Sequence, residues 1–198
     1  MNNQMPTNYK EVAGFMLSHS GPKVALLALI LCLIYRGGHG WHWVDVGIVS
    51  SMFFLRGFLE WTFHKYVWHS HPLPLVHWKI KGPIAIMHAN HHKNPYASEG
   101  LIFGAPGVLS VCALITGGGF LVLQSFSLGV SFLTGFLLVL MVHEWHHVLA
   151  HSNIDPISPL FRRAVMCHRL HHHGDARACM GVSSVLADKV MGTYGGGQ

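Results

Sequence analysis

The stretch from residue 101 to residue 142 restricts the fold of this chain more than any other feature. Its 42 residues include no charged side chain and no histidine. One α-helix of that length would be about 63 Å long, twice the ~30 Å hydrocarbon core of a bilayer. We therefore predict two membrane-spanning helices, over residues 101–116 and 120–142. The three glycines at 117–119 are predicted to form the turn between them, because glycine adopts tight-turn conformations at little steric cost.

A second candidate span covers residues 24–35, an uninterrupted apolar sequence. Twelve residues extend only about 18 Å as a helix, so a crossing requires flanking residues, with Trp41 and Trp43 at the interface. A buried or re-entrant helix is the alternative. Residues 1–20 are mixed in character and leave open an interfacial helix or a loose terminus.

The remaining candidate span covers residues 44–61 and contains Asp45, Arg56 and Glu60. Charges are costly in lipid, so these side chains must face protein or water. The whole chain is 51% hydrophobic and 11% charged, well below the roughly 25% charged share of a soluble domain. The net charge of +5 comes from cations beside apolar runs, which favours a lipid surface over nucleic acid as the partner.

Histidine is the other conspicuous feature, with 18 copies in the chain. Ten of them form four groups with short spacings, in the order His-x-x-x-x-His, His-x-x-His-His, His-x-x-x-His and His-x-x-His-His. The members are His64 and His69; His88, His91 and His92; His147 and His151; and His168, His171 and His172. Residues three and four apart share a helix face, so the last three groups each present imidazoles on one side of a helix.

The first group is less clear, because His64 and His69 lie about 140° apart on an ideal α-helix. They either serve different metals or mark a place where the helix unwinds. Ten imidazoles exceed the four ligands of a tetrahedral zinc ion and suit two metal ions with roughly five or six donors each. Nitrogen ligands accept iron, zinc, copper or nickel, so ligand type leaves the metal open.

The sequence HEWHH at residues 143–147 leaves three alternatives open. His143, His146 and His147 form an overlapping His-x-x-His-His pattern. His143 stands four residues before His147, so it can replace His151 as the partner ligand. The same letters also fit the His-Glu-x-x-His motif of zinc hydrolases, with Glu144 as general base. That hypothesis leaves the other three histidine groups unexplained.

The other histidines are expected to have different roles. His173 points away from the helix face of His168 and His172, which indicates a supporting or surface position. The role of His146 stays open. Five more are expected at the surface or the interface: His19, His39, His42, His71 and His77.

The four cysteines form no Cys-x-x-Cys pair. Cys32 and Cys112 lie inside apolar runs, so no disulfide framework is expected and a reducing compartment is compatible. Cys167 adjoins the last histidine group, where it is expected to pack as a thiol rather than to bind metal. Cys179 is the fourth.

The charge distribution predicts the orientation. The second and fourth spans both end at histidine groups, so these groups are expected at the same membrane face. Nearly all the cations lie on that face as well. Only Arg36 is expected to be exposed on the opposite side of the membrane. By the positive-inside rule, the histidines face the cytoplasm, and an even number of spans places both termini there. The expected fold is all-α, a bundle of about four transmembrane helices with a cytoplasmic helical cap of histidine boxes in one integral-membrane domain, 1–198.

The order of these motifs resembles the integral-membrane fatty acid hydroxylase and sterol desaturase superfamily. The resemblance rests on EWTFHKYVWH, HANHH, HVLAHSN, HRLHHH and GVSSVLADKVMGTY, and it covers about residues 50–194. The spacing is most similar to the fatty acid 2-hydroxylase branch, including the 18 residues between the first group and the second. It implies that all ten grouped histidines are metal ligands, and the HSN motif favours His151 over His143.

The resemblance also implies a di-metal oxygenase, with iron in the active enzyme, zinc as an alternative occupant after purification, and O2 as co-substrate. The expected reaction is hydroxylation of an unactivated C–H bond of a lipid or fatty acyl chain. A desaturase or hydroxylase acting on a sterol, a carotenoid or another acyl chain is the alternative. Residues 1–20 are too short for the fused heme domain of larger members. A separate electron-transfer protein is therefore expected, such as a ferredoxin or a b-type cytochrome with its reductase.

Polar side chains near the histidines are expected to orient the imidazoles by accepting their free N–H groups. The candidates are Glu60, Glu144, Asn153, Asp155 and Asp175. A histidine-rich membrane protein that binds or transports metal is the non-enzyme alternative. Transport would place ionisable ligands near the bilayer centre, and the 101–142 run has none, which favours the oxygenase.

Overall fold

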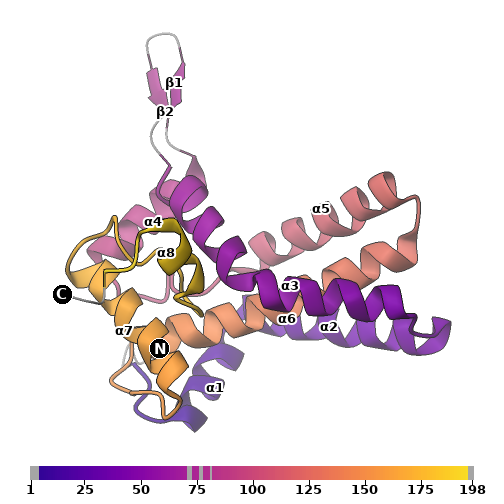
Figure 1. The fold of residues 1–198 in the computed structure, drawn as a ribbon, viewed down its shortest axis with the longest axis horizontal. Helices are drawn as coiled ribbons and strands as arrows, with labels where there is room; N and C mark the ends of the chain where they lie inside the picture. The colour runs from indigo at the N-terminus through magenta and orange to yellow at the C-terminus, as the bar shows by residue number, and fades with distance from the viewer. Residues whose placement is uncertain (1–4, 71–72, 76–77, 81, 196–198) are drawn as a thin grey trace. The chain divides into compact units, whose positions relative to one another are not determined.

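The computed structural model describes residues 5–70, 73–75, 78–80 and 82–195, so His71 and His77 lie outside the described residues. Its elements confirm the predicted helical fold, with one short antiparallel strand pair as an addition (Figure 1). In chain order they are α1 (Tyr9–Ser18), α2 (Ser20–His39), α3 (Trp43–Phe63), the π-helical turn η1 (His64–Trp68), β1 (Leu73–Leu75), β2 (Trp78–Ile80), α4 (Pro83–Lys93), α5 (Ala105–Leu123), α6 (Phe126–Ala150), α7 (Pro159–His173) and α8 (Leu186–Met191).

The chain divides into two compact units. The first, called the histidine unit, consists of Met1–Val12, Gly57–Leu101 and His146–Gln198 and contains all ten predicted ligands. The second, called the apolar unit, consists of Ala13–Arg56 and Ile102–Trp145. Helices α3 and α6 contribute residues to both units. A single domain over 1–198 stays a prediction.

Four helices in the described part of the chain are long and apolar enough to cross a membrane. They are Ser20–His39, Trp43–Trp68, Ala105–Leu123 and Phe126–Ala150. The first resolves the length problem of residues 24–35, because these form the centre of a 20-residue helix, about 30 Å long. The span prediction therefore identified the right four segments and underestimated their lengths.

The predicted turn at residues 117–119 is wrong, because these glycines lie inside helix α5. The chain reverses at Gln124 and Ser125 instead, with Gln124 in the left-handed conformation (φ 50°). Gly119 serves another purpose. A Cβ atom there would lie 2.9 Å from the Cα atom of Gly129 in α6, so a residue with no side chain lets the two helices approach closely, as small residues do in membranes.

The apolar unit packs around a core drawn from α2, α5 and α6. The fully packed members are Ala25, Leu29, Cys32, Val108, Val130, Leu133, Leu137 and Leu140. Large apolar side chains also point outward, including Ile34 on α2 and Leu114 and Val122 on α5. Val122 is 81% exposed. Such exposure is unfavourable in water, and lipid would cover it.

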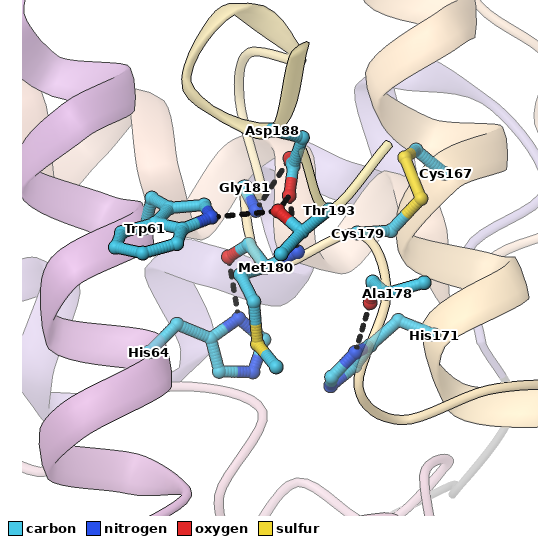
Figure 2. The surroundings of a disulfide bond; sticks show 10 residues. All are labelled: Trp61, His64, Cys167, His171, Ala178, Cys179, Met180, Gly181, Asp188 and Thr193. Atoms are coloured by element: carbon cyan, nitrogen blue, oxygen red, sulfur yellow. Dashed lines mark hydrogen bonds between the residues drawn. A yellow bond between two sulfur atoms is a disulfide. The ribbon is translucent and has the colours of Figure 1, made fainter. Parts of the chain in front are cut away.

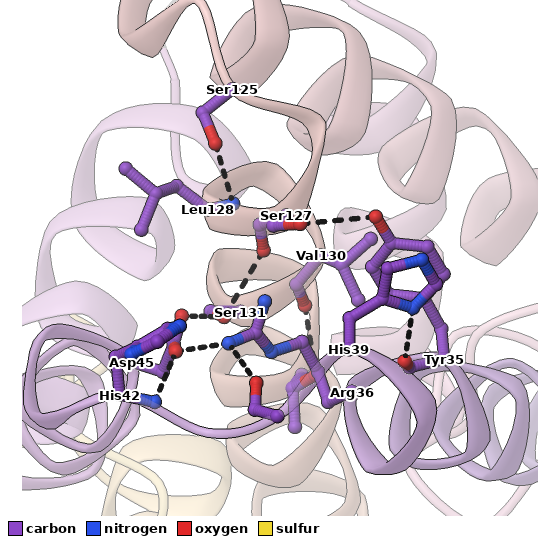
Figure 3. A network of polar contacts seen from close by, with 12 residues as sticks. Tyr35, Arg36, His39, His42, Asp45, Ser125, Ser127, Leu128, Val130 and Ser131 are labelled. Atoms are coloured by element: carbon purple, nitrogen blue, oxygen red, sulfur yellow. Dashed lines mark hydrogen bonds and ion pairs between the residues drawn. The ribbon is translucent and has the colours of Figure 1, made fainter.

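A buried ion pair joins α2 to α3 within the apolar unit (Figure 3). Arg36 was predicted to be exposed, but it is 2% exposed and pairs with Asp45. Asp45 also accepts hydrogen bonds from the hydroxyl of Ser131 (2.6 Å) and the backbone of His42 (2.8 Å), while Arg36 donates to the carbonyl of Gly40 (2.7 Å). Buried charges require such partners, so Asp45 faces protein as predicted.

Helix α1 is ordered at its start by reciprocal capping. The Glu11 carboxylate accepts hydrogen bonds from the backbone and the hydroxyl of Thr7, at 2.8 and 2.9 Å. Asn8 in turn accepts from the backbone N–H of Glu11 at 3.0 Å. The Asn8 side chain thus satisfies one free donor of the helix N-terminus, and Glu11 ties the preceding residue to the first turn. Residues 9–18 form a helix rather than a loose terminus.

Candidate metal centre

The first histidine pair is brought together by a change of helix type. The chain continues from α3 into η1, where the backbone N–H of His69 donates to the carbonyl of His64 at 2.9 Å. This is the i→i+5 bond of a π-helix, which stacks residues five apart on one face. The two ring centroids consequently lie 4.9 Å apart. Of the two alternatives for this pair, the structure shows the altered helix.

Five imidazoles converge to form the first group. Their ligand atoms all lie within 4.8 Å of one another, and they belong to His64, His69, His88, His92 and His171. The Nε2 atoms of His64 and His88 are 3.0 Å apart, as are those of His69 and His171. The group therefore combines residues from η1 and its end, from α4 and from α7.

Four further imidazoles form the second group, again within 4.8 Å of one another: His91, His147, His151 and His172. The Nε2 atom of His91 lies 3.1 Å from that of His147 and 3.2 Å from that of His151. His147 lies in the last turn of α6 and His151 directly follows that helix. This group thus combines α4, the end of α6 and α7.

Each His-x-x-His-His box contributes to both groups. In α4, His88 and His92 belong to the first group and His91 to the second; in α7, His171 belongs to the first and His172 to the second. Adjacent residues point about 100° apart on a helix, so neighbouring imidazoles reach different groups. The prediction that each box faces one way is therefore too simple.

His168 belongs to neither group but lies beside the second. Its side chain is fully buried, and neither ring nitrogen has a hydrogen-bond partner. Its ring centroid is 4.7 Å from that of His172 and 4.8 Å from that of His147. A buried imidazole without a partner is costly, and a small rotation toward a metal would satisfy it. Its role as tenth ligand stays a prediction, as do the ligand roles of the nine grouped histidines.

Backbone carbonyls determine which nitrogen of three histidines carries the proton. The Nδ1 atom of His64 lies 2.6 Å from the carbonyl oxygen of Met180, and that of His171 lies 2.8 Å from the carbonyl oxygen of Ala178 (Figure 2). The Nδ1 atom of His147 lies 2.9 Å from the carbonyl oxygen of Leu101. A carbonyl only accepts, so Nδ1 must donate in each ring. The Nε2 lone pairs then point into the histidine groups, where a cation would satisfy them. The donor set therefore fits metal ions.

Burial keeps seven of the imidazoles outside the candidate membrane spans neutral. Desolvation, followed by repulsion from neighbouring imidazoles, lowers the pKa of His91 and His92 to about 4. Desolvation lowers the pKa of His171 to about 3. The same cause lowers the pKa of His88, His151, His168 and His172. Neutral imidazole is the form that binds metal, so the rings are prepared for ligation at pH 7.

The two glutamates expected to orient imidazoles hold backbone segments. Glu60 accepts from the backbone of Ser183 at 2.8 Å and from its hydroxyl at 2.6 Å. Glu144 accepts from the backbone of Phe103 at 3.0 Å. Both carboxylates are buried. Each therefore fixes a loop of its own unit.

The other three candidates have surface positions. Asp155 pairs with Arg169 at 2.8 Å, and Asp175 pairs with Arg177 at 3.1 Å. Asn153 is exposed. The imidazole acceptors that the structure does show are carbonyls, which sequence reasoning missed because every residue carries one and no side-chain pattern marks it.

The histidines outside the two groups vary in burial. His143 and His146 are buried, and the ring of His146 packs on Phe161 at 4.7 Å. His173 is exposed, with its ring 6.3 Å from that of Tyr96. His39 and His42 are also exposed, and His19 is partly buried. His147 groups with His151 rather than His143, and this geometry does not favour the zinc-hydrolase hypothesis.

A disulfide bond joins Cys167 of α7 to Cys179. The expectations that Cys167 packs as a thiol and that no disulfide forms are therefore wrong, whereas Cys32 and Cys112 are free as expected. The two half-cystines are twelve residues apart and meet because the chain turns back after α7 (Figure 2). The bond ties the helix that carries His171 to the segment that accepts its Nδ1 proton.

Four potential membrane spans and two groups of converging histidines that could hold metal ions are the features of membrane metalloproteins with histidine boxes. The sequence model of the fatty acid hydroxylase family matches residues 49–193, and the chain belongs to this family. No curated protein and no solved structure matches the chain. Membership confirms the predicted superfamily and implies an oxidoreductase of the membrane; the 2-hydroxylase branch stays a prediction.

Proposed function

We propose that this protein is a membrane di-iron oxygenase that hydroxylates an unactivated C–H bond of a lipid or fatty acyl chain. The observation that carries the proposal is the convergence of nine histidines into two adjacent ligand groups in a member of the fatty acid hydroxylase family. Two iron ions bound there would supply the activation of O2 that this reaction requires.

The chain's own contribution is to hold and orient the ligands. The first group offers five imidazoles, and the second offers four with His168 beside it. The carbonyls of Leu101, Ala178 and Met180 orient three of them. Burial lowers the pKa of six others, His88, His91, His92, His151, His168 and His172, which favours the neutral form. Imidazole also accepts zinc, so zinc is the expected competitor during purification.

The proposed lipid substrate agrees with the position of the ligands along the chain. His64 belongs to the candidate span Trp43–Trp68, and His147 belongs to the span Phe126–Ala150. Both ligand groups therefore include a residue at the end of a membrane helix. A substrate dissolved in the bilayer could reach such a site without entering water.

Electrons are proposed to come from a separate electron-transfer protein, a ferredoxin or a b-type cytochrome with its reductase. Exposed cations in the histidine unit support this docking, since an acidic partner would be attracted to them. They are Lys93, Arg162, Arg163, Arg177 and Lys189. By the positive-inside rule, the same cations favour a cytoplasmic position for this unit, and four spans then place both ends of this chain on that side.

The test is the metal content and the lipid profile of cells that express the intact protein. We expect two iron ions per chain, and lipids that gain one oxygen atom in the presence of O2 and a reductant. Lipids that lose two hydrogens instead would identify a desaturase. A lipid profile identical to that of cells expressing an inactive histidine variant would contradict both activities.

A further inference from the structure

The residues Ala178–Gly181, called the carbonyl segment, accept hydrogen bonds from two histidines through their backbone carbonyls. The carbonyl of Ala178 accepts from Nδ1 of His171 at 2.8 Å, and that of Met180 accepts from Nδ1 of His64 at 2.6 Å (Figure 2). Both histidines belong to the first group. The position of this segment therefore sets the orientation of two of its five imidazoles.

Asp188 of α8 holds the carbonyl segment from the other side. Its side chain is fully buried. One carboxylate oxygen accepts the backbone N–H of Met180 at 2.7 Å, and the other accepts that of Gly181 at 2.9 Å. Two adjacent amides bound to one carboxylate leave the segment little freedom to rotate.

The bond to Gly181 acts directly on His64. The carbonyl of Met180 and the N–H of Gly181 belong to the same planar peptide unit, and in a trans peptide they point in opposite directions. Asp188 accepts from one end of this unit while His64 donates to the other. Hydrogen bonds in such a chain polarise one another. The negative charge of Asp188 therefore strengthens the carbonyl as an acceptor and makes His64 a better ligand.

Thr193 completes the arrangement. Its hydroxyl donates to Asp188 at 2.7 Å and accepts from the indole N–H of Trp61 at 2.8 Å, and Trp61 stands three residues before His64. The carbonyl of Thr193 accepts the N–H of Cys179 at 2.7 Å. That N–H shares a peptide unit with the carbonyl bound to His171, so this second peptide is held at both ends as well.

We propose that Asp188 is a positioning residue of the metal centre, acting on His64 through the Met180–Gly181 peptide. It touches neither metal nor substrate. It fixes the orientation and the basicity of a ligand through one backbone unit, with Thr193 holding the neighbouring peptide. This inference rests on the proposed function, because it requires that the first histidine group binds metal.

The test compares the full-length protein with its Asp188→Asn variant, loaded with iron and challenged with a chelator. Asparagine keeps the size of the side chain but removes the charge and one acceptor. We expect metal affinity to fall about 10–100-fold, the usual effect of removing a group that supports a ligand. Glu11→Gln is the matched control, since Glu11 also accepts a backbone N–H and a threonine hydroxyl but does so at the start of α1.

A second measurement separates positioning from folding. The absorption spectrum of the Co²⁺-loaded protein reports the ligand environment, and we expect it to change in Asp188→Asn and to stay unchanged in Glu11→Gln. If Asp188→Asn does not fold, the pair Thr193→Val and Thr193→Ser takes its place. Serine keeps the hydroxyl and should retain metal, whereas valine should weaken metal binding about tenfold.

Three outcomes would contradict the inference, and they are distinguishable. A folded Asp188→Asn variant with wild-type metal affinity and Co²⁺ spectrum would remove the positioning role and leave the proposed function intact. A wild-type protein that binds no metal would remove both. Equal metal affinity in Thr193→Val and Thr193→Ser would likewise contradict the role given to the threonine hydroxyl.

Discussion

Single imidazoles differ in role even where the sequence repeats the same letters. In HRLHHH, His171 belongs to the first ligand group and His172 to the second, whereas His173 is exposed. The difference follows from the rotation of about 100° between successive helical residues. The same letters therefore specify two residues of different histidine groups and one surface residue.

Replacing His171 by alanine is expected to prevent metal loading of the first group and to abolish the proposed oxygenase activity, because it removes one of the five imidazoles of that group. The measurement is metal content per chain together with product formation. His173→Ala is the matched control, one residue away and outside both groups, and should retain both properties. Full metal occupancy in His171→Ala would show that the ligand assignment is wrong.

The metal-free protein should lose stability in mild acid. Burial lowers the folded-state pKa of His91 and His92 to about 4, whereas the unfolded value is about 6.5. Between these values the unfolded chain binds more protons, so the free energy of unfolding is highest above about pH 6.5 and falls as the pH drops toward 4. Denaturation of the metal-free protein at pH 7 and pH 5 measures this difference. Equal stability at the two values would contradict the lowered pKa values.

Among the helices, the glycines and the disulfide determine which segments are in contact, which the pattern of apolar residues does not specify. The three glycines at 117–119 allow either a turn or a close helix contact, and the structure uses Gly119 for the contact. Gly118 by comparison has no atom within 4 Å of an added Cβ. These neighbouring positions therefore predict opposite responses to the same substitution.

Gly119→Ala is expected to destabilise the protein by about 1–3 kcal/mol, because its Cβ would overlap the backbone of Gly129. Gly118→Ala should be neutral or should stabilise it by up to about 1 kcal/mol, because alanine favours a helix more than glycine does. Unfolding of both variants in detergent gives the comparison. If Gly118→Ala were the more damaging of the two, the glycines would form a turn after all.

Reduction of the Cys167–Cys179 bond should lower the free energy of unfolding by about 3 kcal/mol, the chain-entropy value for a short loop. The measurement is unfolding with and without a dithiol reductant. The double variant Cys167→Ser and Cys179→Ser should show the reduced stability at once and no further response to the reductant. An unchanged free energy of unfolding of the wild-type protein in the presence of the reductant would show that the disulfide does not stabilise the fold.

For the whole molecule, charge and redox chemistry both bear on orientation. The orientation proposed from the positive-inside rule has the histidine unit in the cytoplasm. Thiols are kept reduced there, so Cys167 and Cys179 should be a dithiol in growing cells and a disulfide after purification in air. Trapping of free thiols in living cells tests this expectation.

The topology has a direct test in reporters inserted into the loops. A reporter active only in the cytoplasm should work at the C-terminal end of the chain, and it should fail at Gly40 or Gln124, which follow the first and third spans. The opposite pattern would place the metal centre outside the cytoplasm. It would also agree with a permanent disulfide.

The sequence by itself determined the four apolar helices and the histidine boxes, because hydrophobic length and helical periodicity are local properties. It also led to the family, since the order of the boxes is a one-dimensional pattern. The tertiary structure decided how the imidazoles divide into two groups. It did so through a π-helical turn at His64 and through two boxes that each serve both groups.

The features that the sequence did not predict arise from contacts that form only in the folded chain. Three contacts depend on how the chain folds back. They are the Cys167–Cys179 disulfide, the ion pair between Arg36 and Asp45, and the hydrogen bond from the N–H of Gly181 to Asp188. The groups that orient His64 and His171 are backbone carbonyls, which every residue possesses. A sequence therefore identifies the candidate ligands, but only packing selects which carbonyl faces each one.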